Sequence, residues 1–298
     1  MVDQPLSWDL LADLQLLLQF HFMQNAAVVG TIVAVLGGAV GYFVVLRGQS
    51  FVAHMLSQVG FPGAAAAVLL HVSPVIGLVV FCTGAALGIN AVGGRLQAGR
   101  RVESAAVGSL LAFSLGLGLL FFRLFAGSAQ AIYAFLFGTI LGITDRDGVV
   151  AALTTVACLL ALAFLCRPLL FASIDAAVAE AQGVPVRLLS TLFLLITAVA
   201  VAESVQIVGT LLVFALLVAP AASAQRLTAR PYHGMALSIL LSLLFTWAGL
   251  AVAYFSNYPV GFFISTFAFI TYLGIRLGGT AREVARRTRH ATAAAGLA

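Results

Sequence analysis

Long apolar segments alternate with short polar connections along almost the whole chain. Crossing the roughly 30 Å hydrocarbon core of a bilayer takes about 20 residues of α-helix. The pattern predicts an all-α, polytopic transmembrane helical bundle of about 8–9 spans. Nine segments are interpreted as spans, at residues 21–46, 51–71, 75–94, 104–122, 148–166, two within 186–225 with a tight turn near 205–209, 234–254 and 261–277.

Three further segments are too short or too polar to cross. Residues 7–20 alternate acidic and apolar residues, which favours a short amphipathic helix at the membrane surface. The apolar stretch 130–142 indicates a re-entrant or interfacial helix. The polar stretch 171–185 predicts a short helix that a serine or Asp175 caps and Gly183 ends.

The composition makes lipid the solvent of this chain. Of its 298 residues, 62% are hydrophobic and 8% are charged, and a soluble protein of this length could not bury so much apolar surface. The first thirteen residues carry three aspartates and no basic residue, so no cleaved leader is expected. All fifteen basic residues are arginines, which excludes a Walker A lysine and Schiff-base chemistry. The three cysteines lie in apolar segments without metal-ligand spacing.

The arginines predict the orientation. With the N-terminus outside and nine crossings, thirteen of the fifteen arginines fall on the cytoplasmic side, the exceptions being Arg123 and Arg146. The C-terminus is then cytoplasmic, and the chain divides into a transmembrane permease domain at 1–280 and a basic cytoplasmic tail at 281–298. Because the basic residues are not gathered on a soluble domain, the net charge of +5 does not indicate nucleic-acid binding.

The densest polar cluster near a span lies in the stretch that follows the first one. His54 and Gln58 are four residues apart, so in a helix they share one face, with Ser57 beside them. The Pro62-Gly63 pair is then expected to break the helix at membrane depth. Polar side chains next to a broken span are typical of a transport site near the membrane midplane, although a buried histidine can also be satisfied by a neighbouring carbonyl.

Glu203 is the one acidic residue of ten that lies inside an apolar segment. An ionisable group within the bilayer is costly unless it is paired or faces water, which makes it a functional candidate by default. It also lies close to the predicted turn at 205–209, from which it could instead reach the headgroups. Imidazole suits zinc and other borderline metals, and carboxylate suits manganese as well.

Three stretches resemble the permease subunits of bacterial ABC importers for zinc and manganese. The stretch from Arg47 to Gly63 resembles the family's arginine after the first span and its Gly-Asp-Ala-x-Ser-His-Ala-x-x-Pro-Gly pattern. Residues 208–224 match a second signature almost throughout, and residues 175–183 resemble the family's cytoplasmic coupling helix. The likeness covers nearly the whole chain, with its parts in the right order.

The resemblance implies a homodimeric or paired permease in the prokaryotic plasma (inner) membrane, in contact with lipid on its outer surface. A separate ABC ATPase subunit would drive it, and an extracytoplasmic solute-binding protein would feed it. Asp175, Glu180 and Gly183 would belong to the helix that docks on the ATPase. No cofactor is expected on this chain, because ATP would act only through the partner subunit and zinc or manganese would be cargo.

The same stretch departs from the family where the metal is expected to pass. His54 and Gln58 stand where the family has Asp and His, whereas Ser57 and the Pro62-Gly63 pair match. The departure motivates the hypothesis that His54 and Glu203 together restore one imidazole and one carboxylate across two spans. The candidate metal-contacting residues are His54, Ser57, Gln58 and Glu203.

Other substrates and other classes of protein stay open. The departure is also compatible with another metal, a metal chelate or an unrelated solute. A secondary carrier would share the composition but would normally show an internal repeat, and the two halves of this chain show none. An intramembrane enzyme would need two membrane aspartates, a His-Glu-x-x-His helix or a Gly-x-Ser-x-Gly nucleophile, and the sequence has none of these.

Overall fold

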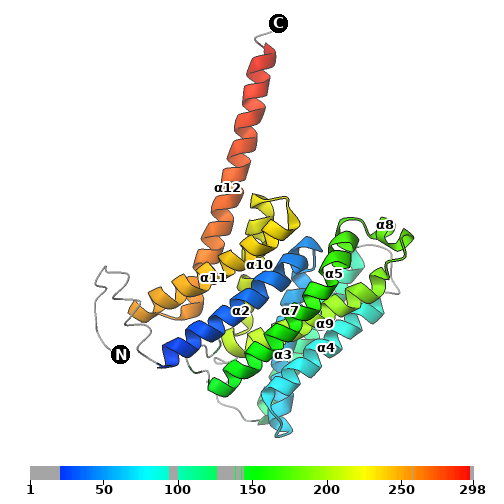
Figure 1. Cartoon of the computed structure of the whole chain (residues 1–298). Helices are drawn as coiled ribbons and strands as arrows, with labels where there is room; N and C mark the ends of the chain where they lie inside the picture. The colour runs from blue at the N-terminus through cyan, green and yellow to red at the C-terminus, as the bar shows by residue number, and fades with distance from the viewer. Residues whose placement is uncertain are drawn as a thin grey trace.

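The computed structural model describes residues 21–93, 100–125, 144–256 and 258–295, together with Gly138 and Gly142. Within these residues every secondary-structure element of six residues or more is an α-helix, so the predicted all-α bundle is confirmed (Figure 1). The helices are α2 (His21–Leu46), α3 (Ser50–Leu69), α4 (Pro74–Gly93), α5 (Arg100–Phe125), α7 (Asp145–Ile174), α8 (Ala176–Ala181), α9 (Val186–Val208), α10 (Thr210–Leu227), α11 (Pro231–Phe255) and α12 (Val260–Ala295).

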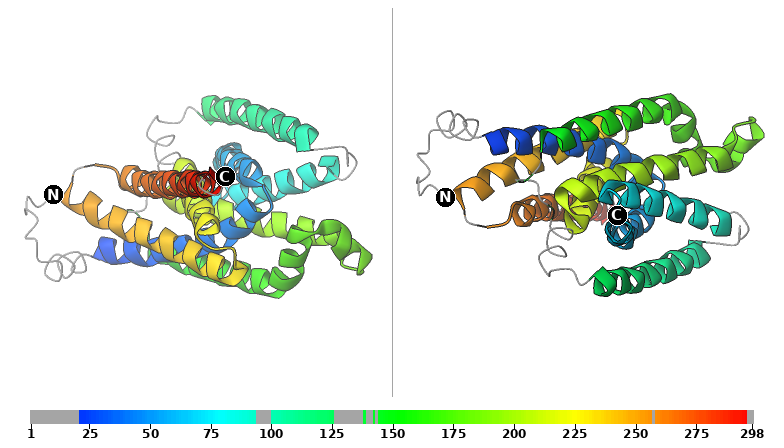
Figure 2. Two further views of the ribbon diagram at one scale, coloured as in Figure 1. Left: turned by 90° about the horizontal axis from the view of Figure 1, so that it is seen from above. Right: turned by 90° about the horizontal axis from the view of Figure 1, so that it is seen from below.

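Eight of these helices are long and apolar enough to cross a membrane. The predicted fourth span corresponds to α5, whose apolar stretch Ala105–Phe121 is shorter and which lies at the periphery of the bundle in both views of Figure 2. The fifth span was predicted to end at residue 166, but α7 continues to Ile174 with Pro168 inside it. A proline inside a helix removes one backbone hydrogen bond, and the helix tolerates that loss here.

Side-chain hydrogen bonds sort the helix ends into two groups. Asn90 Nδ2, near the end of α4, donates to Thr191 Oγ1 in the second turn of α9 at 2.7 Å. Asn25 Nδ2, near the start of α2, donates to Asp145 Oδ1 at the first residue of α7, also at 2.7 Å. The arginine count assigns the first pair to the cytoplasmic side and the second pair to the outer side, so the contacts agree with the predicted alternation of the chain.

Glycines allow α2 to lie against its neighbours in the core. A Cβ atom at Gly38 would lie 2.6 Å from the Cα of Ile239 on α11, and one at Gly41 would clash with the carbonyl oxygen of Leu217 on α10. Real Cβ atoms do not come so close to backbone, so the three helices meet at these glycines. Small residues that let backbones approach are a common basis of helix packing in membranes.

The expected break at Pro62-Gly63 is wrong. Helix α3 is continuous from Ser50 to Leu69 with Pro62 inside it. Gly63 has a packing role instead, because a Cβ atom there would clash with the carbonyl oxygen of Gly77 on α4. The Pro-Gly pair therefore brings α3 and α4 together rather than opening the helix.

The helix interruption lies at Gly209, within the predicted turn near 205–209. Helix α9 ends at Val208 and α10 begins at Thr210, and Gly209 between them has a φ of +82°, which favours glycine. Gly138 packs directly on this point, since a Cβ atom there would clash with the carbonyl carbon of Val208. The rest of the predicted re-entrant helix at 130–142, apart from Gly142, lies outside the described residues, as does the predicted surface helix at 7–20.

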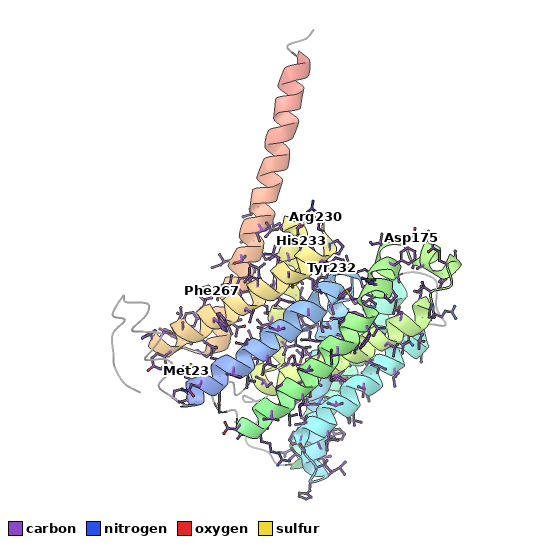
Figure 3. The ribbon with its side chains drawn as sticks, viewed as in Figure 1. Met23, Asp175, Arg230, Tyr232, His233 and Phe267 are labelled. Carbon is purple, nitrogen blue, oxygen red and sulfur yellow. The ribbon has the colours of Figure 1, made fainter. Side chains whose placement is uncertain are left out.

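Two elements leave the bundle at one end. The short helix α8 stands at the edge of this end, and α12 runs beyond the bundle toward the C-terminus (Figure 1). Figure 3 shows Asp175, which precedes α8, and Arg230, which precedes α11, toward this same end, with Met23 toward the other. Helix α12 continues to Ala295, across most of the region where the sequence predicts a separate tail.

Candidate functional site

His54 lies in the second turn of α3 and is half-buried. Its ring packs against the ring of Phe214 on α10, with centroids 4.9 Å apart and an angle of 66° between the planes. The Nδ1 atom of His54 is buried and has no hydrogen-bond partner among the described residues. In the neutral imidazole this nitrogen can donate or accept a hydrogen bond, and when it carries no proton it can bind a metal ion.

Gln58 and Ser57 accompany His54 on α3, as the spacing predicts. Gln58 is 9% exposed and Ser57 is fully buried. The hydroxyl of Ser57 donates to the carbonyl oxygen of His54 at 2.7 Å. Its proton is therefore committed to the helix backbone, and only its oxygen lone pairs remain for a cation. Gln58 keeps an amide oxygen that can bind a cation or orient a bound water.

His54, Ser57 and Gln58 lie at the middle depth of the bundle. The thiol of Cys82 donates to the carbonyl oxygen of Leu56, between His54 and Gln58, at 3.3 Å. Cys82 is eight residues from the start of α4 and eleven from its end. His54 and Gln58 therefore lie level with the middle of α4, which has 20 residues. On their own helix they are closer to an end, because α3 begins only four residues before His54.

Glu203 also lies deep in the bundle. The Phe193 ring on α9 packs edge-on against the Phe43 ring near the cytoplasmic end of α2, with centroids 6.1 Å apart. Glu203 follows Phe193 by ten residues, which corresponds to about 15 Å along an α-helix, half the thickness of the hydrocarbon core. Its side chain is 3% exposed. This geometry favours a position near the midplane over one at the headgroups.

Helix α7 is one of the helices that pack against α9, which carries Glu203. Asp147 and Cys158 lie on one face of α7, where Asp147 is half-buried and Cys158 is buried. Thr155 lies between them on the same face, and its buried hydroxyl has no hydrogen-bond partner among the described residues. The amide oxygen of Gln206, one turn beyond Glu203 on α9, is buried and unpartnered in the same sense.

The structure does not join His54 and Glu203 directly. Within the described residues they form no hydrogen bond or ion pair with each other, and no three His, Cys, Asp or Glu side chains gather into a group that could enclose a metal ion. His54 contacts α10 and Glu203 faces α7. The two polar groups are separate positions in the interior of the bundle.

The short helix predicted within residues 171–185 is present as α8, with the caps expected from the sequence. Asp175 Oδ1 accepts a hydrogen bond from the Val178 backbone N–H at 3.0 Å, and Gly183 has a φ of +84° that permits the chain to turn away. Ala179 is buried against the bundle, whereas Glu180 and Val178 are exposed. The helix therefore exposes the carboxyl of Glu180 and the apolar side chain of Val178 among three exposed alanines.

Two groups of functional interest had no clear signal in the sequence. Phe214 is one of many apolar residues of its span, and only its place in the second signature, residues 208–224, could have drawn attention to it. The contacts of Arg47 with Ser173 and Ser190 join residues more than 120 positions apart. Sequence spacing carries no information about such a contact.

Residues 19–277 match the model of a family described as the ABC 3 transport family. The chain is 32% identical to the manganese import system permease protein ScaB of Streptococcus parasanguinis over 244 residues, which cover 82% of this chain and 85% of that protein. It is 29% identical to the manganese transport system membrane protein MntC of Listeria monocytogenes over 245 residues, 82% of this chain and 86% of that protein.

A solved structure has the same architecture. It is described as PsaBC from Streptococcus pneumoniae in complex with Fab, and it matches with a TM-score of 0.79 and 29% sequence identity. The match covers 89% of this chain and 94% of the other. The structural match therefore agrees with the sequence matches: both relate this chain to membrane subunits of transport proteins.

Proposed function

Since the chain belongs to the ABC 3 transport family, we propose that it is the membrane-spanning permease subunit of an ABC importer that moves a divalent transition metal into the cytoplasm. The observation that carries the proposal is the match of most of the chain to manganese import permeases at up to 33% identity. The chain is a multi-pass membrane protein of the bacterial plasma membrane and a transport subunit rather than an enzyme.

Manganese is the favoured cargo, with zinc as the second candidate. The relatives are named for manganese import, and the side chains inside the bundle offer an imidazole, a carboxylate, an amide oxygen and hydroxyls. Oxygen ligands with imidazole suit manganese, whereas thiolates would select zinc or copper. The thiol of Cys82 is bonded to a backbone carbonyl, and none of the three cysteines belongs to a group of three metal-ligating side chains among the described residues.

The metal would meet His54 and Gln58 on one side of the pathway and Glu203 at a second position. This develops the hypothesis that the imidazole and the carboxylate work together, since their lack of direct contact favours two successive stations over one cage. Weak binding at several sites lets an ion both enter and leave a pathway. The unpartnered oxygens of Thr155 and Gln206 would complete the station at Glu203.

Three partners complete the importer. An ABC ATPase subunit would dock at α8, where Val178 and Glu180 are exposed. An extracytoplasmic solute-binding protein would deliver the metal at the opposite end of the bundle. A second copy of the permease would supply the other wall of the pathway.

ATP-dependent uptake by the reconstituted complex tests this function. The permease, its ATPase subunit and its binding protein are placed in proteoliposomes and supplied with manganese, zinc or iron. We expect uptake of manganese that stops without ATP or without the binding protein. Uptake of zinc alone would change the proposed cargo from manganese to zinc and leave the importer function unchanged. No uptake of any of the three by an intact complex would contradict the free-ion function and favour a metal chelate, as the altered Asp/His pair would then indicate.

A further inference from the structure

Arg47 connects three helices at the cytoplasmic end of the bundle. It lies in the short connection between α2 and α3 and is half-buried. Its Nη2 donates to Ser190 Oγ on α9 at 2.6 Å, and its Nη1 lies 3.4 Å from Ser173 Oγ on α7. The guanidinium also stacks over the Phe193 ring, 5.7 Å from the centroid.

The two serine hydroxyls are oriented to accept from Arg47. Ser173 donates its own proton to the carbonyl oxygen of Leu169, and Ser190 donates to that of Val186. Each hydroxyl is thus anchored to its own helix and turns its lone pairs outward. A planar guanidinium with two forked nitrogens can reach both acceptors together, which a lysine ammonium on a single point cannot do equally well.

The segment held by Arg47 includes the whole of α8. Ser173 lies two residues before Asp175, the N-cap of α8, and Ser190 lies in the first turns of α9, which follows it. The chain leaves the bundle at one of these serines and returns at the other. One side chain from a different part of the sequence therefore closes the base of the coupling helix.

The other side of Arg47 leads to the metal pathway. The backbone N–H of Arg47 bonds the carbonyl of Phe43, and that of Gln49 bonds the carbonyl of Val44, so the connection is a tight turn fixed to α2. Helix α3 begins at Ser50, three residues after Arg47, and His54 follows one turn later. A displacement of Arg47 must shift the start of α3.

No carboxylate among the described residues forms an ion pair with Arg47. Its hydrogen bonds among the described residues are to neutral hydroxyls, and its Nε is buried without a partner. Burial lowers the pKa of the guanidinium, although arginine remains charged at neutral pH. Hydrogen bonds from a charged donor are stronger than those between neutral groups, so the two serine hydroxyls are the polar contacts that hold the guanidinium in place.

We propose that Arg47 is a positioning residue that transmits the movement of α8 to α3, so that closure of the docked ATPase changes the access of the metal to His54 and Gln58. This inference rests on the proposed function, because it needs an ATPase at α8. The link is mechanical: the bases of α7 and α9 move with α8, the guanidinium follows its serine acceptors, and the turn that carries it moves the first residues of α3.

Two measurements on the reconstituted complex test the proposal. The first is metal uptake per ATP hydrolysed. In Arg47→Gln, ATP hydrolysis should continue while uptake per ATP falls about tenfold, within the range of allosteric coupling energies. Arg47→Lys should recover little of the coupling, since it keeps the charge but loses the fork. The control is Gln225→Leu, which removes the 2.9 Å bond from Gln225 Nε2 to the Tyr42 carbonyl at the same end of α2.

The second measurement does not depend on transport. Phe51, the second residue of α3, is 48% exposed, and the native cysteines are buried, so Phe51→Cys offers a single reactive thiol at the start of α3. Its maleimide labelling rate should change on ATP binding, and Arg47→Gln should abolish that change. The Ser173→Ala/Ser190→Ala pair should act in the same way, and it replaces Arg47→Gln if that variant does not assemble.

The outcomes separate this proposal from the proposed function. Three results would show that Arg47 is not a coupling residue. The labelling change could be absent in the complex that carries Phe51→Cys alone, it could persist in both Arg47→Gln and the Ser173→Ala/Ser190→Ala pair, or uptake per ATP could be unchanged in Arg47→Gln. If wild type moves no metal but its labelling responds to ATP and loses that response in Arg47→Gln, the coupling role stands and the proposed cargo is wrong.

Discussion

The cytoplasmic ends of the helices and the middle of the bundle treat polar side chains differently. At the ends, side chains tie one helix to another: Arg47 to α7 and α9, Asn90 to Thr191, and Gln225 to the Tyr42 carbonyl. Two atoms of the turn after α2, Arg47 Nε and Gln49 Oε1, are also buried without a partner among the described residues. In the middle, His54 Nδ1 and the oxygens of Thr155 and Gln206 are buried without partners among the described residues.

The difference separates scaffold from pathway. Buried polar groups are almost always hydrogen-bonded, and an unpartnered one costs free energy. Under the proposed function, these unpartnered groups would bind the metal ion or its water. The bonded groups hold the frame in which the unbonded ones are presented, and mutations in the two regions should fail in different ways.

The largest effect is expected in the scaffold at Gly41. Gly41→Val should prevent assembly of a stable permease, because its side chain would clash with the Leu217 carbonyl oxygen where α2 meets α10. The measurement is the yield and thermal unfolding of purified protein. Gly84→Val on α4 is the matched control, since a Cβ atom there meets nothing within 4 Å. Equal yields of the two variants would contradict the packing described for α2.

The next largest effect is expected in the pathway at Glu203. Glu203→Gln preserves the size of the side chain but removes the charge, so thermal stability should stay near that of wild type while metal uptake falls about tenfold or more, as on loss of a group near a metal. Uptake in proteoliposomes measures it. Glu283→Gln, which neutralises one carboxyl on the part of α12 beyond its apolar span Val260–Gly279, serves as a comparison for total charge. Unchanged uptake in Glu203→Gln would remove Glu203 from the pathway.

A smaller effect is expected at the cap of α8. Asp175→Ala should weaken the short helix by about 1 kcal/mol, the usual contribution of an N-cap, because the Val178 N–H loses its acceptor. The permease itself should fold normally, and its affinity for the ATPase subunit should fall by up to about fivefold. A pull-down titration measures that affinity, and Asp175→Ser, which retains a capping oxygen, should restore most of it.

The sequence predicted most of the architecture, because hydrophobic spans and arginine-bearing loops follow directly from the physics of the bilayer. The helix at 176–181, its cap at Asp175 and the turn near Gly209 were also predictable, since capping and left-handed glycines are local properties. The family resemblance, carried by residues 47–63 and 208–224, was confirmed by the match over residues 19–277.

The errors came from packing between distant helices. Pro62-Gly63 is typical of a break in isolation, but α4 presents Gly77 at the same point and the two glycines hold the helices together. The extension of α7 beyond Pro168 likewise depends on its neighbours. The position of Glu203 against α7 and of His54 against Phe214 required the fold, because nothing in the sequence says which face of a wholly apolar helix meets which neighbour.

ATP-dependent manganese uptake by His54→Ala, measured beside Gln225→Leu, tests the central claim most directly. Each variant loses one polar side chain, on α3 in His54→Ala and on α10 in Gln225→Leu. Of the two, His54 has the unpartnered nitrogen at the middle of the bundle, whereas Gln225 is bonded to the Tyr42 carbonyl. The account predicts that both complexes assemble and unfold near the wild-type temperature, that Gln225→Leu transports normally, and that uptake by His54→Ala falls about tenfold or more. Normal uptake by His54→Ala, or an equal loss in both variants, would contradict it.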